Sequence, residues 1–390
     1  MIPSKIEHII TKYLSNSVTT TEEEQLSQWL EDATNKLYFK DYVKTNYAIT
    51  YSISNPDTKT ALHNILKQTK PKVIGLPLIK YAAAVVVFIA VGIGAYTYFY
   101  NEEAVTNRAL LKIKPGYNKA TLVLFTGDTL NLETHKNQII TKGNSIINNN
   151  DRVLEYNNKT VDREIDPTYI PKFNTLFVPV GGMYQIKLPD GTRVWLNSAT
   201  SLKFPERFVG NYRDVTLEGE AYFDVTKSSK PFIVRTPTAD VTVLGTEFNI
   251  SSYAKDPHFS ATLVEGKIKL TSVINNASEE LIPSQRAVIL KGDTKINLTP
   301  IETEIYTSWK EGKFYFERET LEQILTKMER WYNVDITFED SSIKTETFTG
   351  VAYKDKPIGH LLDMICKTTK LNYKITTNKK TKKYEIIVTR

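Results

Sequence analysis

The stretch YQIKLPDGTRVWLN, residues 184–197, places two runs of alternating apolar and polar residues on either side of an Asp–Gly pair. Alternation with a period of two is typical of half-buried strands, and Asp–Gly between two such runs favours a hairpin turn. The stretch ATLVLFTGDTLNLE, residues 120–133, repeats this pattern. Aligning the copies sets Leu124, Gly127, Leu130 and Leu132 opposite Leu188, Gly191, Val194 and Leu196. The sequence therefore predicts two copies of one β-hairpin.

More strand patterns follow the second hairpin. Alternating runs continue at residues 213–225, 231–236, 239–251 and 260–272. Many short strands separated by Gly-containing turns predict an all-β domain with a sandwich or jelly-roll-like arrangement. The Asn-rich segment 142–167, between the two hairpins, is less regular and predicts either a long loop or short strands.

The pattern changes again after Trp309. Strand patterns occur at residues 312–319, 333–339, 346–353, 371–377 and 383–389, and helical patterns occur at 320–332 and 356–369. The resulting order β-α-β-β-α-β-β predicts a compact α+β domain at the C-terminal end of the chain.

Residues 1–75 show helical rather than strand periodicity, beginning with a helix expected over residues 4–15. We expect Asn35 to cap a third helix and Pro56 to lie at the start of a fourth. About four short helices make a small all-α bundle with a marginal core, and such a domain often gains stability by wrapping around a partner.

The second of these helices lies in TTTEEEQLSQWLED, residues 19–32. Thr21 and Glu24 have the spacing of a capping box. Three apolar residues follow on one side of the expected helix, namely Leu26, Trp29 and Leu30. Trp29 belongs either to the bundle core or to a surface that binds a partner.

The stretch YAAAVVVFIAVGIGAYTYFY, residues 81–100, contains no charged residue. A helix of this length rises by about 30 Å, the thickness of a bilayer core, and the tyrosines at both ends suit the membrane interfaces. The alternative is a buried core helix, which rarely needs so long an uncharged run. We expect a transmembrane helix within residues 76–100. A signal peptide is not expected, because the stretch starts late and lacks a convincing cleavage site.

The net charge, the single cysteine and the few histidines argue against several classes of function. The net charge of +6 on 390 residues is spread out, without a basic block that could follow a phosphate backbone, so direct nucleic-acid binding is not expected. Cys366 is the single cysteine, which excludes an intramolecular disulfide, and its apolar neighbours indicate a buried residue. The five histidines are scattered, so we expect neither a metal site nor another cofactor.

Three motifs in order carry a resemblance to a known family: residues 188–225, 231–251 and 261–270. The match from Gly181 to Leu270 strongly resembles the periplasmic domain of FecR-type anti-sigma factors. Residues 309–390 resemble the domain that follows FecR in transporter-linked members, which is similar to the short N-terminal domain of secretins and TonB-dependent receptors. The N-terminal bundle is similar to the cytoplasmic sigma-binding domain of the family.

The resemblance implies a signal-transducing inner-membrane protein that regulates transcription. The helical domain, residues 1–75, would bind an extracytoplasmic-function (ECF) sigma factor, with Leu26, Trp29 and Leu30 as contacts. A single transmembrane helix at 76–100 would put the N-terminus in the cytoplasm and the C-terminus in the periplasm. There, a β or linker region at 101–178, the FecR-type β domain at 179–305 and the α+β domain at 309–390 would meet the signalling domain of a TonB-dependent transporter.

The resemblance also singles out the bond between Gly245 and Thr246. Some members of the family cleave themselves at a Gly–Thr bond, where the Thr hydroxyl attacks the preceding carbonyl to form an ester that water opens. The alternative is a glycine kept for a β-bulge or a close backbone approach. A second such bond, Gly191–Thr192, is expected to be only a turn.

Two other functions remain open from the sequence. Glu218, Glu220 and Asp224 lie at even spacing on one strand, and a carbohydrate enzyme would need two such carboxylates around a cleft. An alternating acidic row is more typical of a solvated sheet face, and Trp195 and Trp331 have apolar neighbours at core spacing, so we expect no enzyme. The second alternative is a membrane-anchored periplasmic docking protein without sigma regulation. The transported nutrient, either a glycan or an iron–siderophore, is left open.

Overall fold

The computed structural model describes residues 4–14, 18–32, 34–36, 38–40, 42–43, 113–142, 145–150, 153–158, 171–378 and 383–390. Contacts divide the chain into a large unit, Pro115–Asp335 with Thr347–Lys356, and a small unit, Met1–Lys114 with Ile336–Glu346 and Pro357–Arg390. The predicted membrane span at 81–100 lies outside the described residues. Among the helices that are described, none combines the length and apolarity needed to cross a bilayer.

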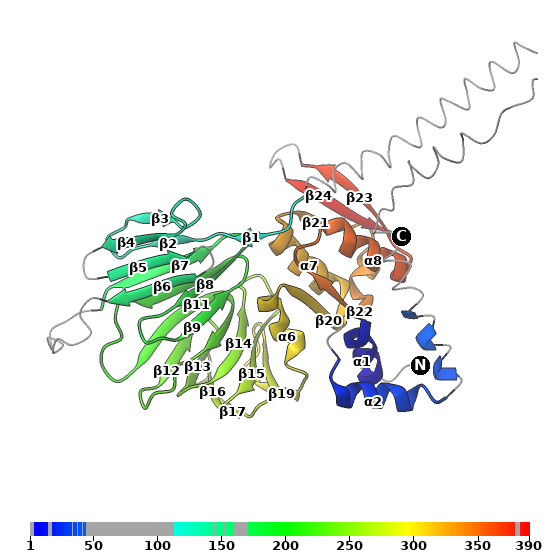
Figure 1. Cartoon of the computed structure of the whole chain (residues 1–390), viewed down its shortest axis with the longest axis horizontal. Coiled ribbons are helices and arrows are strands. Elements are labelled where there is room, and N and C mark those ends of the chain that lie inside the picture. The colour runs from blue at the N-terminus through cyan, green and yellow to red at the C-terminus, as the bar shows by residue number, and fades with distance from the viewer. Residues whose placement is uncertain are drawn as a thin grey trace, which may run out of the picture. The chain divides into compact units, whose positions relative to one another are not determined.

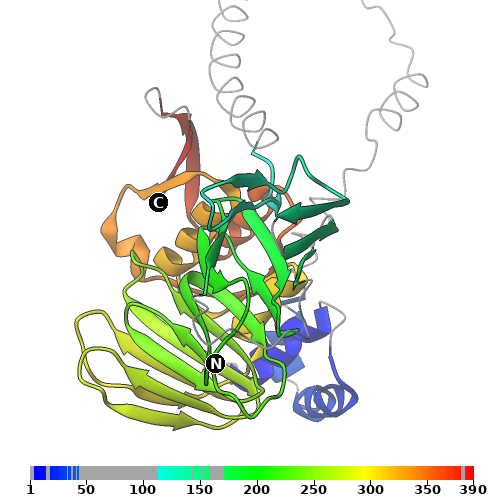
Figure 2. The ribbon, with the colours of Figure 1, turned by 90° about the vertical axis from the view of Figure 1, so that its left-hand side faces the viewer.

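The large unit contains the predicted β domain as two hydrogen-bonded sheets (Figure 1, Figure 2). The first sheet has the order β3 (Thr129–Asn131), β2 (Thr121–Val123), β7 (Phe173–Val178), β10 (Thr200–Pro205), β11 (Arg213–Asp224), β12 (Phe232–Arg235), β13 (Ala239–Val243), β16 (Ile268–Ser272) and β17 (Ser278–Leu281). The second has the order β4 (Gln138–Lys142), β5 (Ser145–Asn150), β6 (Val153–Asn158), β8 (Gly182–Lys187), β9 (Arg193–Leu196), β11, β14 (Glu247–Ser252), β15 (His258–Glu265), β18 (Gln285–Leu290) and β19 (Asn297–Pro300). A short strand, β1 (Tyr117–Asn118), lies parallel to β8.

Strand β11 belongs to both sheets. Its first part pairs with β10 and β12, and from Gly219 onward it pairs with β9 and β14. Gly219 has a φ of +108°, which a residue with a Cβ rarely adopts. A Cβ there would also lie 2.5 Å from Thr200 Oγ1. The glycine therefore lets one strand turn from the first sheet into the second.

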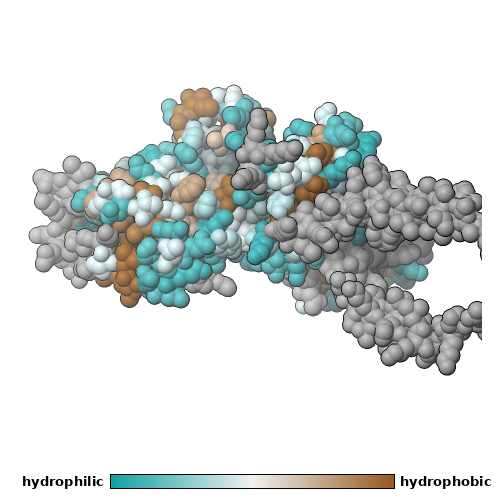
Figure 3. Space-filling model, turned by 90° about the horizontal axis from the view of Figure 1, so that it is seen from above, coloured by the Kyte–Doolittle hydropathy of each residue, from teal (hydrophilic) through white to brown (hydrophobic). Residues whose placement is uncertain are grey.

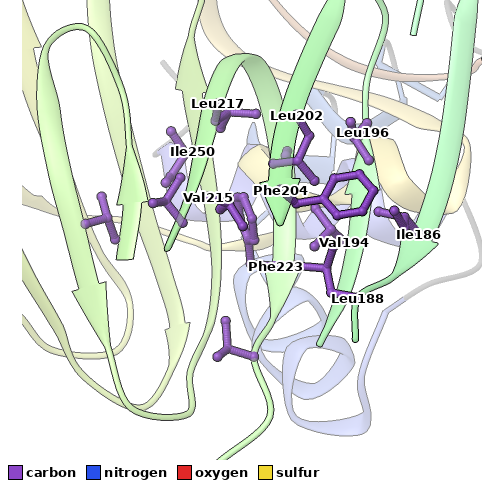
Figure 4. Close-up of a cluster of buried hydrophobic side chains, with 14 of the residues drawn as sticks. Ile186, Leu188, Val194, Leu196, Leu202, Phe204, Val215, Leu217, Phe223 and Ile250 are labelled. Carbon is purple, nitrogen blue, oxygen red and sulfur yellow. The ribbon is translucent and has the colours of Figure 1, made fainter. Parts of the chain in front are cut away.

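The apolar faces of both sheets meet in one core. Ile186, Val194, Leu202, Leu217 and Phe223 are fully buried, and Figure 4 shows how these side chains gather from β8, β9, β10 and β11. The alternation seen in the sequence follows from this packing, because every second residue of a strand points to the same face. The predicted large β domain is confirmed.

Both predicted hairpins are present and share one turn geometry. Gly127 and Gly191 each have a φ of +87°. In the first hairpin the Leu124 amide donates to the Asp128 carbonyl at 2.9 Å, and in the second the Leu188 amide donates to the Thr192 carbonyl at 2.8 Å. The described residues of the Asn-rich segment 142–167 form the short strands β5 and β6, and short strands were one of the two predictions for it.

The order of elements after Trp309 agrees with the prediction. It is β20 (Lys313–Thr320), α7 (Leu321–Tyr332), β21 (Asp335–Phe338), β22 (Thr347–Tyr353), α8 (Ile358–Thr369), β23 (Asn372–Thr377) and β24 (Tyr384–Thr389), with short helices α6 (Glu304–Thr307) and η2 (Ser308–Glu311) before it and η3 (Ser341–Thr345) within it. Strand β20 pairs with β22, whereas β21, β24 and β23 form a separate sheet. By contacts, β20, α7 and β22 belong to the large unit with the β domain, and α8, β23 and β24 belong to the small unit. The predicted domain boundaries stay a prediction.

Helices α1 (Ser4–Leu14) and α2 (Thr20–Trp29) confirm the predicted helical N-terminal region. The capping box lies two residues earlier than predicted, because Thr19 rather than Thr21 caps α2 and Glu22 closes the box. Asn35 lies within a helical turn instead of capping it. Asp32 takes that role, and its Oδ1 accepts hydrogen bonds from the amides of Thr34 and Asn35 at 2.7 and 3.3 Å.

Candidate functional site

Lys354 follows β22 and is only 2% exposed, which is rare for a lysine. Its Nζ lies 3.8 Å from the ring centre of Trp331, 5.5 Å from that of Phe314 and 5.7 Å from that of Trp309. It also donates a hydrogen bond to Asn197 Oδ1 at 3.2 Å. We call Lys354, Trp309, Phe314, Trp331 and Asn197 the Lys354 cage. All five belong to the large unit.

Hydrogen bonds fix the two tryptophan rings of the cage. Trp331, near the end of α7, donates its indole N–H to the carbonyl oxygen of Lys354 at 2.8 Å. Trp309, in η2, donates its indole N–H to Asn249 Oδ1 on β14 at 3.0 Å. Since both ring edges are held, their faces stay turned toward the ammonium group, as cation–π contacts require.

The carboxylate of Glu220 joins the cage to the second sheet. It accepts a hydrogen bond from Asn197 Nδ2 at 2.7 Å and another from Asn249 Nδ2 at 3.1 Å. Glu220 comes directly after Gly219, so the turn of β11 into the second sheet also positions this carboxylate. A continuous network therefore runs from Trp309 through Asn249, Glu220 and Asn197 to Lys354.

Burial and charge act in opposite directions on Lys354. Burial lowers the pKa of its ammonium group to about 7, although the nearby Glu220 carboxylate raises it. The aromatic faces and the Asn197 oxygen also favour the charged form. The pKa of Lys354 is therefore close to neutral pH, so small changes in its surroundings alter its charge.

Arg330 forms a second anchor between α7 and the β domain. Its guanidinium binds Asp256 in bidentate fashion, with distances of 2.6 and 3.1 Å, and lies 3.9 Å over the ring of Tyr253. The Tyr253 hydroxyl in turn donates to the Ser198 carbonyl at 2.8 Å. The Gly181 amide donates to the Arg330 carbonyl at 2.7 Å. The helix is thus fixed through both its side chain and its backbone.

A small cavity of about 60 Å³ lies beside the cage, lined in part by Ser198, Glu220 and Tyr253. A water molecule needs about 10–15 Å³, so the cavity has room for a few waters but not for a sugar. Glu220 is the only carboxylate among its described lining residues, whereas glycoside hydrolysis needs two. In the described ranges no group of acidic, His or Cys side chains could hold a metal. The cage and its small cavity are therefore suited to joining α7 and β22 to the β domain rather than to binding a sugar.

The predicted acidic row separates in the structure. Glu218 is exposed, as a solvated sheet face would have it, but Glu220 is half-buried in the cage network. Asp224 pairs with Arg193 instead. Trp331 is buried as expected, whereas Trp195 is half-buried on β9, where its ring contacts Tyr222 edge-on at 5.7 Å.

The three predicted sigma-binding residues lie at the end of α2. Leu26 is buried with Ile9 and Ile10 of α1, and Trp29 and Leu30 pack half-buried against this cluster. Leu26 therefore supports the fold, whereas parts of Trp29 and Leu30 face solvent. Nearby, Glu22 pairs with Lys12 at 2.8 Å. Burial works to raise the pKa of Glu22, but hydrogen bonds from Lys12 and Thr19 outweigh it and lower the pKa to about 2.

The Gly245–Thr246 bond lies in the tight connection between β13 and β14. A Cβ on Gly245 would lie 2.4 Å from Lys227 Cγ and 2.7 Å from Lys227 Cα, so close backbone approach alone explains the glycine. The buried Thr246 hydroxyl donates to the Lys267 carbonyl at 3.1 Å. Self-cleavage stays a prediction. In contrast, the Thr192 hydroxyl donates to Asp190 at 2.8 Å within the hairpin turn, as expected for a turn.

Comparison with known proteins agrees with this architecture. Residues 174–269 match the family model described as FecR protein, and residues 313–382 match the one described as FecR, C-terminal. Two segments of the chain are thus similar to FecR-family proteins. The resemblance drawn from residues 181–270 is thereby confirmed. No curated protein matches the chain.

Part of this chain is also similar to solved structures. They include two crystal structures, at 1.65 and 2.50 Å resolution, of a candidate anti-sigma factor from Parabacteroides distasonis. Both are 28% identical to this chain with a TM-score of 0.50, and the match covers 55% of this chain and 98% of that chain. The similarity thus spans nearly all of the solved protein.

The Lys354 cage could not be predicted from the sequence. Asn197 and Lys354 are separated by 157 positions and follow no recognisable motif. A signal was present only for Glu220 and Trp331, which were considered for carbohydrate chemistry rather than for joining two parts of the chain. Cys366 is buried as predicted, and burial raises the pKa of its thiol to about 12.

Proposed function

We propose that this protein is a FecR-type anti-sigma factor that relays a signal from outside the inner membrane to transcription. The family matches at residues 174–269 and 313–382 carry the proposal, and the similarity to a candidate anti-sigma factor supports it. In the finer form of the proposal, the partner in the cytoplasm is an ECF sigma factor. The partner in the periplasm is the signalling domain of a TonB-dependent transporter.

The proposal includes one membrane span at residues 81–100, between the N-terminal helices and the β domain. The uncharged run of 20 residues supports it. The N-terminus would then lie in the cytoplasm and the C-terminus in the periplasm. This arrangement places the sigma-binding helices and the transporter-binding domains on opposite sides of the inner membrane.

The Lys354 cage supports a relay rather than two independent binding domains. Lys354 and Trp331 come from the FecR C-terminal match, and Asn197 and Glu220 come from the FecR match. Because Lys354 donates to Asn197 and Asn197 donates to Glu220, a partner that shifts Lys354 at the end of β22 would also disturb Asn197. A binding event on one matched segment would thus reach the other.

Capture of the partner tests the anti-sigma role. The full chain with a C-terminal tag would be purified in mild detergent from its native cells, and the bound proteins identified by mass spectrometry. We expect one small sigma factor. Trp29→Ala should reduce its recovery by about tenfold or more, because aromatic anchors at interfaces typically contribute about 2 kcal/mol.

Trp195→Ala is the matched control, since Trp195 is also a half-buried tryptophan but lies on β9 of the β domain. It should leave recovery of the sigma factor unchanged. If the wild-type chain is purified folded and no sigma factor accompanies it, the anti-sigma role is wrong. A periplasmic docking protein without sigma regulation would then be the better explanation.

A further inference from the structure

Lys354 and Asn197 bring an amine and a carboxamide together inside the large unit. Lysine side chains normally lie on the hydrophilic surface, such as the teal areas of Figure 3, whereas Lys354 is 2% exposed and faces three aromatic rings. Its Nζ lies 3.2 Å from Asn197 Oδ1. Because a C=O bond is about 1.2 Å long, Nζ lies at most about 4.4 Å from Asn197 Cγ. The amine and the carboxamide carbon are thus close to reacting distance in a site that excludes most water.

Other groups hold the two ends of the Asn197 carboxamide. The backbone amide of Ser198 donates to Oδ1 at 2.9 Å, where negative charge develops if an amine attacks Cγ. The Glu220 carboxylate accepts a hydrogen bond from Nδ2 at 2.7 Å, and Nδ2 is the nitrogen that leaves in such an attack. Asn249 donates to the other Glu220 oxygen at 3.1 Å and so fixes the carboxylate. The carboxamide is therefore polarised at its oxygen and contacted by a proton acceptor at its nitrogen.

We propose that Lys354 Nζ and Asn197 Cγ form an intramolecular amide bond, with Glu220 as the catalytic residue that carries the proton. The neutral amine attacks Cγ with its lone pair, and the electron pair of the C=O bond moves to Oδ1, beside the Ser198 amide. Glu220 takes a proton from Nζ and gives one to Nδ2. The C=O bond then re-forms, the bond between Cγ and Nδ2 breaks, and ammonia leaves. One amide replaces another, so the step consumes no other reactant.

The surroundings of Lys354 favour the neutral amine that this reaction needs. Burial lowers the pKa of its ammonium group to about 7, against about 10.4 in water. Among the described residues, Glu220 on β11 is the charged group that acts in the opposite direction, and the contacts from η2, β20 and α7 are uncharged aromatic rings. The cavity of about 60 Å³, which Asn197 and Glu220 both line, has room for the released ammonia, a molecule about as small as water.

The bond ties two segments together that are distant in sequence. Asn197 lies in the FecR match at 174–269 and Lys354 in the FecR C-terminal match at 313–382. Because only the neutral amine reacts, a chain kept at pH 6, where most of Lys354 is charged, retains both free side chains. That form is the starting material for the test, and it is also the form in which unfolding and fragments of the chain are measured.

Mass spectrometry of tryptic peptides tests the bond directly. The full chain is purified in mild detergent at pH 6, incubated at pH 6 or pH 9, and digested. We expect the peptide 194–203, which contains Asn197, joined to the peptide that contains Lys354, with the loss of one ammonia. About a tenth of the amine is neutral at pH 6 and nearly all of it at pH 9, so the initial rate of joining should be about tenfold higher at pH 9.

The variants separate the roles of the residues. Glu220→Gln should slow the joining by about a hundredfold or more, because a carboxamide cannot take the proton from Nζ. Glu218→Gln is the matched control, since Glu218 is an exposed carboxylate on the same strand, and it should leave the rate unchanged. Lys354→Met and Asn197→Ala should give no joined peptide.

Three results count against the proposal. A wild-type chain that stays folded by circular dichroism at pH 9 and yields no joined peptide would overturn it. Unjoined peptide 194–203 that has lost ammonia equally in wild type and in Lys354→Met would also overturn it, because Asn197 would then have closed on the backbone nitrogen of Ser198 instead. Equal rates of joining in wild type and Glu220→Gln would overturn the role of Glu220.

Discussion

At the scale of the residue, Lys354 shows how one buried charge can join two segments that are distant in sequence. Removing an ammonium group from water is costly, and the cage compensates with three aromatic faces, one amide oxygen and a nearby carboxylate. If one partner moves, the charge loses part of this compensation. The lysine thus makes the contact between β22 and the β domain sensitive to small displacements.

The stability of the large unit should depend on pH through Lys354. In the folded chain burial lowers its pKa to about 7, whereas an unfolded lysine has a pKa of about 10.4. Between these values the unfolded chain binds one more proton, so the free energy of unfolding rises with pH, by on the order of 5 kcal/mol across the window. Tryptophan fluorescence during chemical unfolding at pH 6, 7, 8 and 9 measures this slope.

Lys354→Met is the control for this pH dependence, because methionine keeps the length of the side chain but has no charge. As the pH rises, the unfolding free energy of wild type should increase relative to that of the variant, because only wild type loses the cost of burying a charged lysine. A difference that stays constant from pH 6 to pH 9 would show that Lys354 does not titrate there.

The Gly245–Thr246 bond gives a second prediction at this scale. If the Thr246 hydroxyl attacks the Gly245 carbonyl, the purified chain should migrate as two fragments, residues 1–245 and 246–390. Thr246→Ala should then migrate as one intact chain. Thr192→Ala, at the other Gly–Thr bond, should still give both fragments. N-terminal sequencing of the smaller fragment locates the cut, and an intact wild-type chain would rule out self-cleavage.

At the scale of the element, β11 determines how the two sheets are joined. Its alternating pattern was visible in the sequence. The change of sheet at Gly219 was not, because a glycine in a strand pattern can equally mark a bulge or a close backbone approach. The hairpins around Gly127 and Gly191 were predictable, since their turn chemistry is local. The helix cap was misplaced because three threonines precede three glutamates, and capping boxes in neighbouring registers differ little in energy.

Gly219→Ala should destabilise the large unit by about 3 kcal/mol or more, since it adds an unfavourable φ to a steric clash with Thr200. Gly210→Ala is the matched control, because Gly210 has a φ of +79° but a Cβ added there would meet no atom within 4 Å, leaving only a backbone cost of about 1–2 kcal/mol. Thermal unfolding followed by circular dichroism distinguishes them. Equal losses would mean that the contact with Thr200 is unimportant.

At the scale of the whole molecule, the sequence predicted the order of its parts better than the contacts between them. Helices, β domain and the final α+β order followed from periodicity, which is set by local geometry. The attachment of β20, α7 and β22 to the β domain depends on long-range pairs such as Arg330 with Asp256 and Lys354 with Asn197. Such pairs leave no periodic trace, so the division of the C-terminal region was not predictable.

Protease protection tests the proposed membrane topology. In spheroplasts, an added protease should digest residues 113–390 and leave an N-terminal tag with the residues before the span intact, because the bilayer shields only the cytoplasmic side. Cells opened by detergent provide the control, in which the tagged part should also be digested. Loss of the N-terminal tag in intact spheroplasts would contradict the proposed orientation.

The path of the chain through its two units has a consequence for building chimeras. Between Lys114 and Pro357 the chain passes from one unit to the other four times. A graft that joins two relatives near residue 309 would therefore give the large unit a sheet, β20 with β22, from one parent and a β domain from the other. Such hybrids should fold only if the donor of Lys354 and Trp331 is compatible with the recipient's Asn197, Glu220 and Asn249. A chimera should therefore take all five of these residues from the same parent.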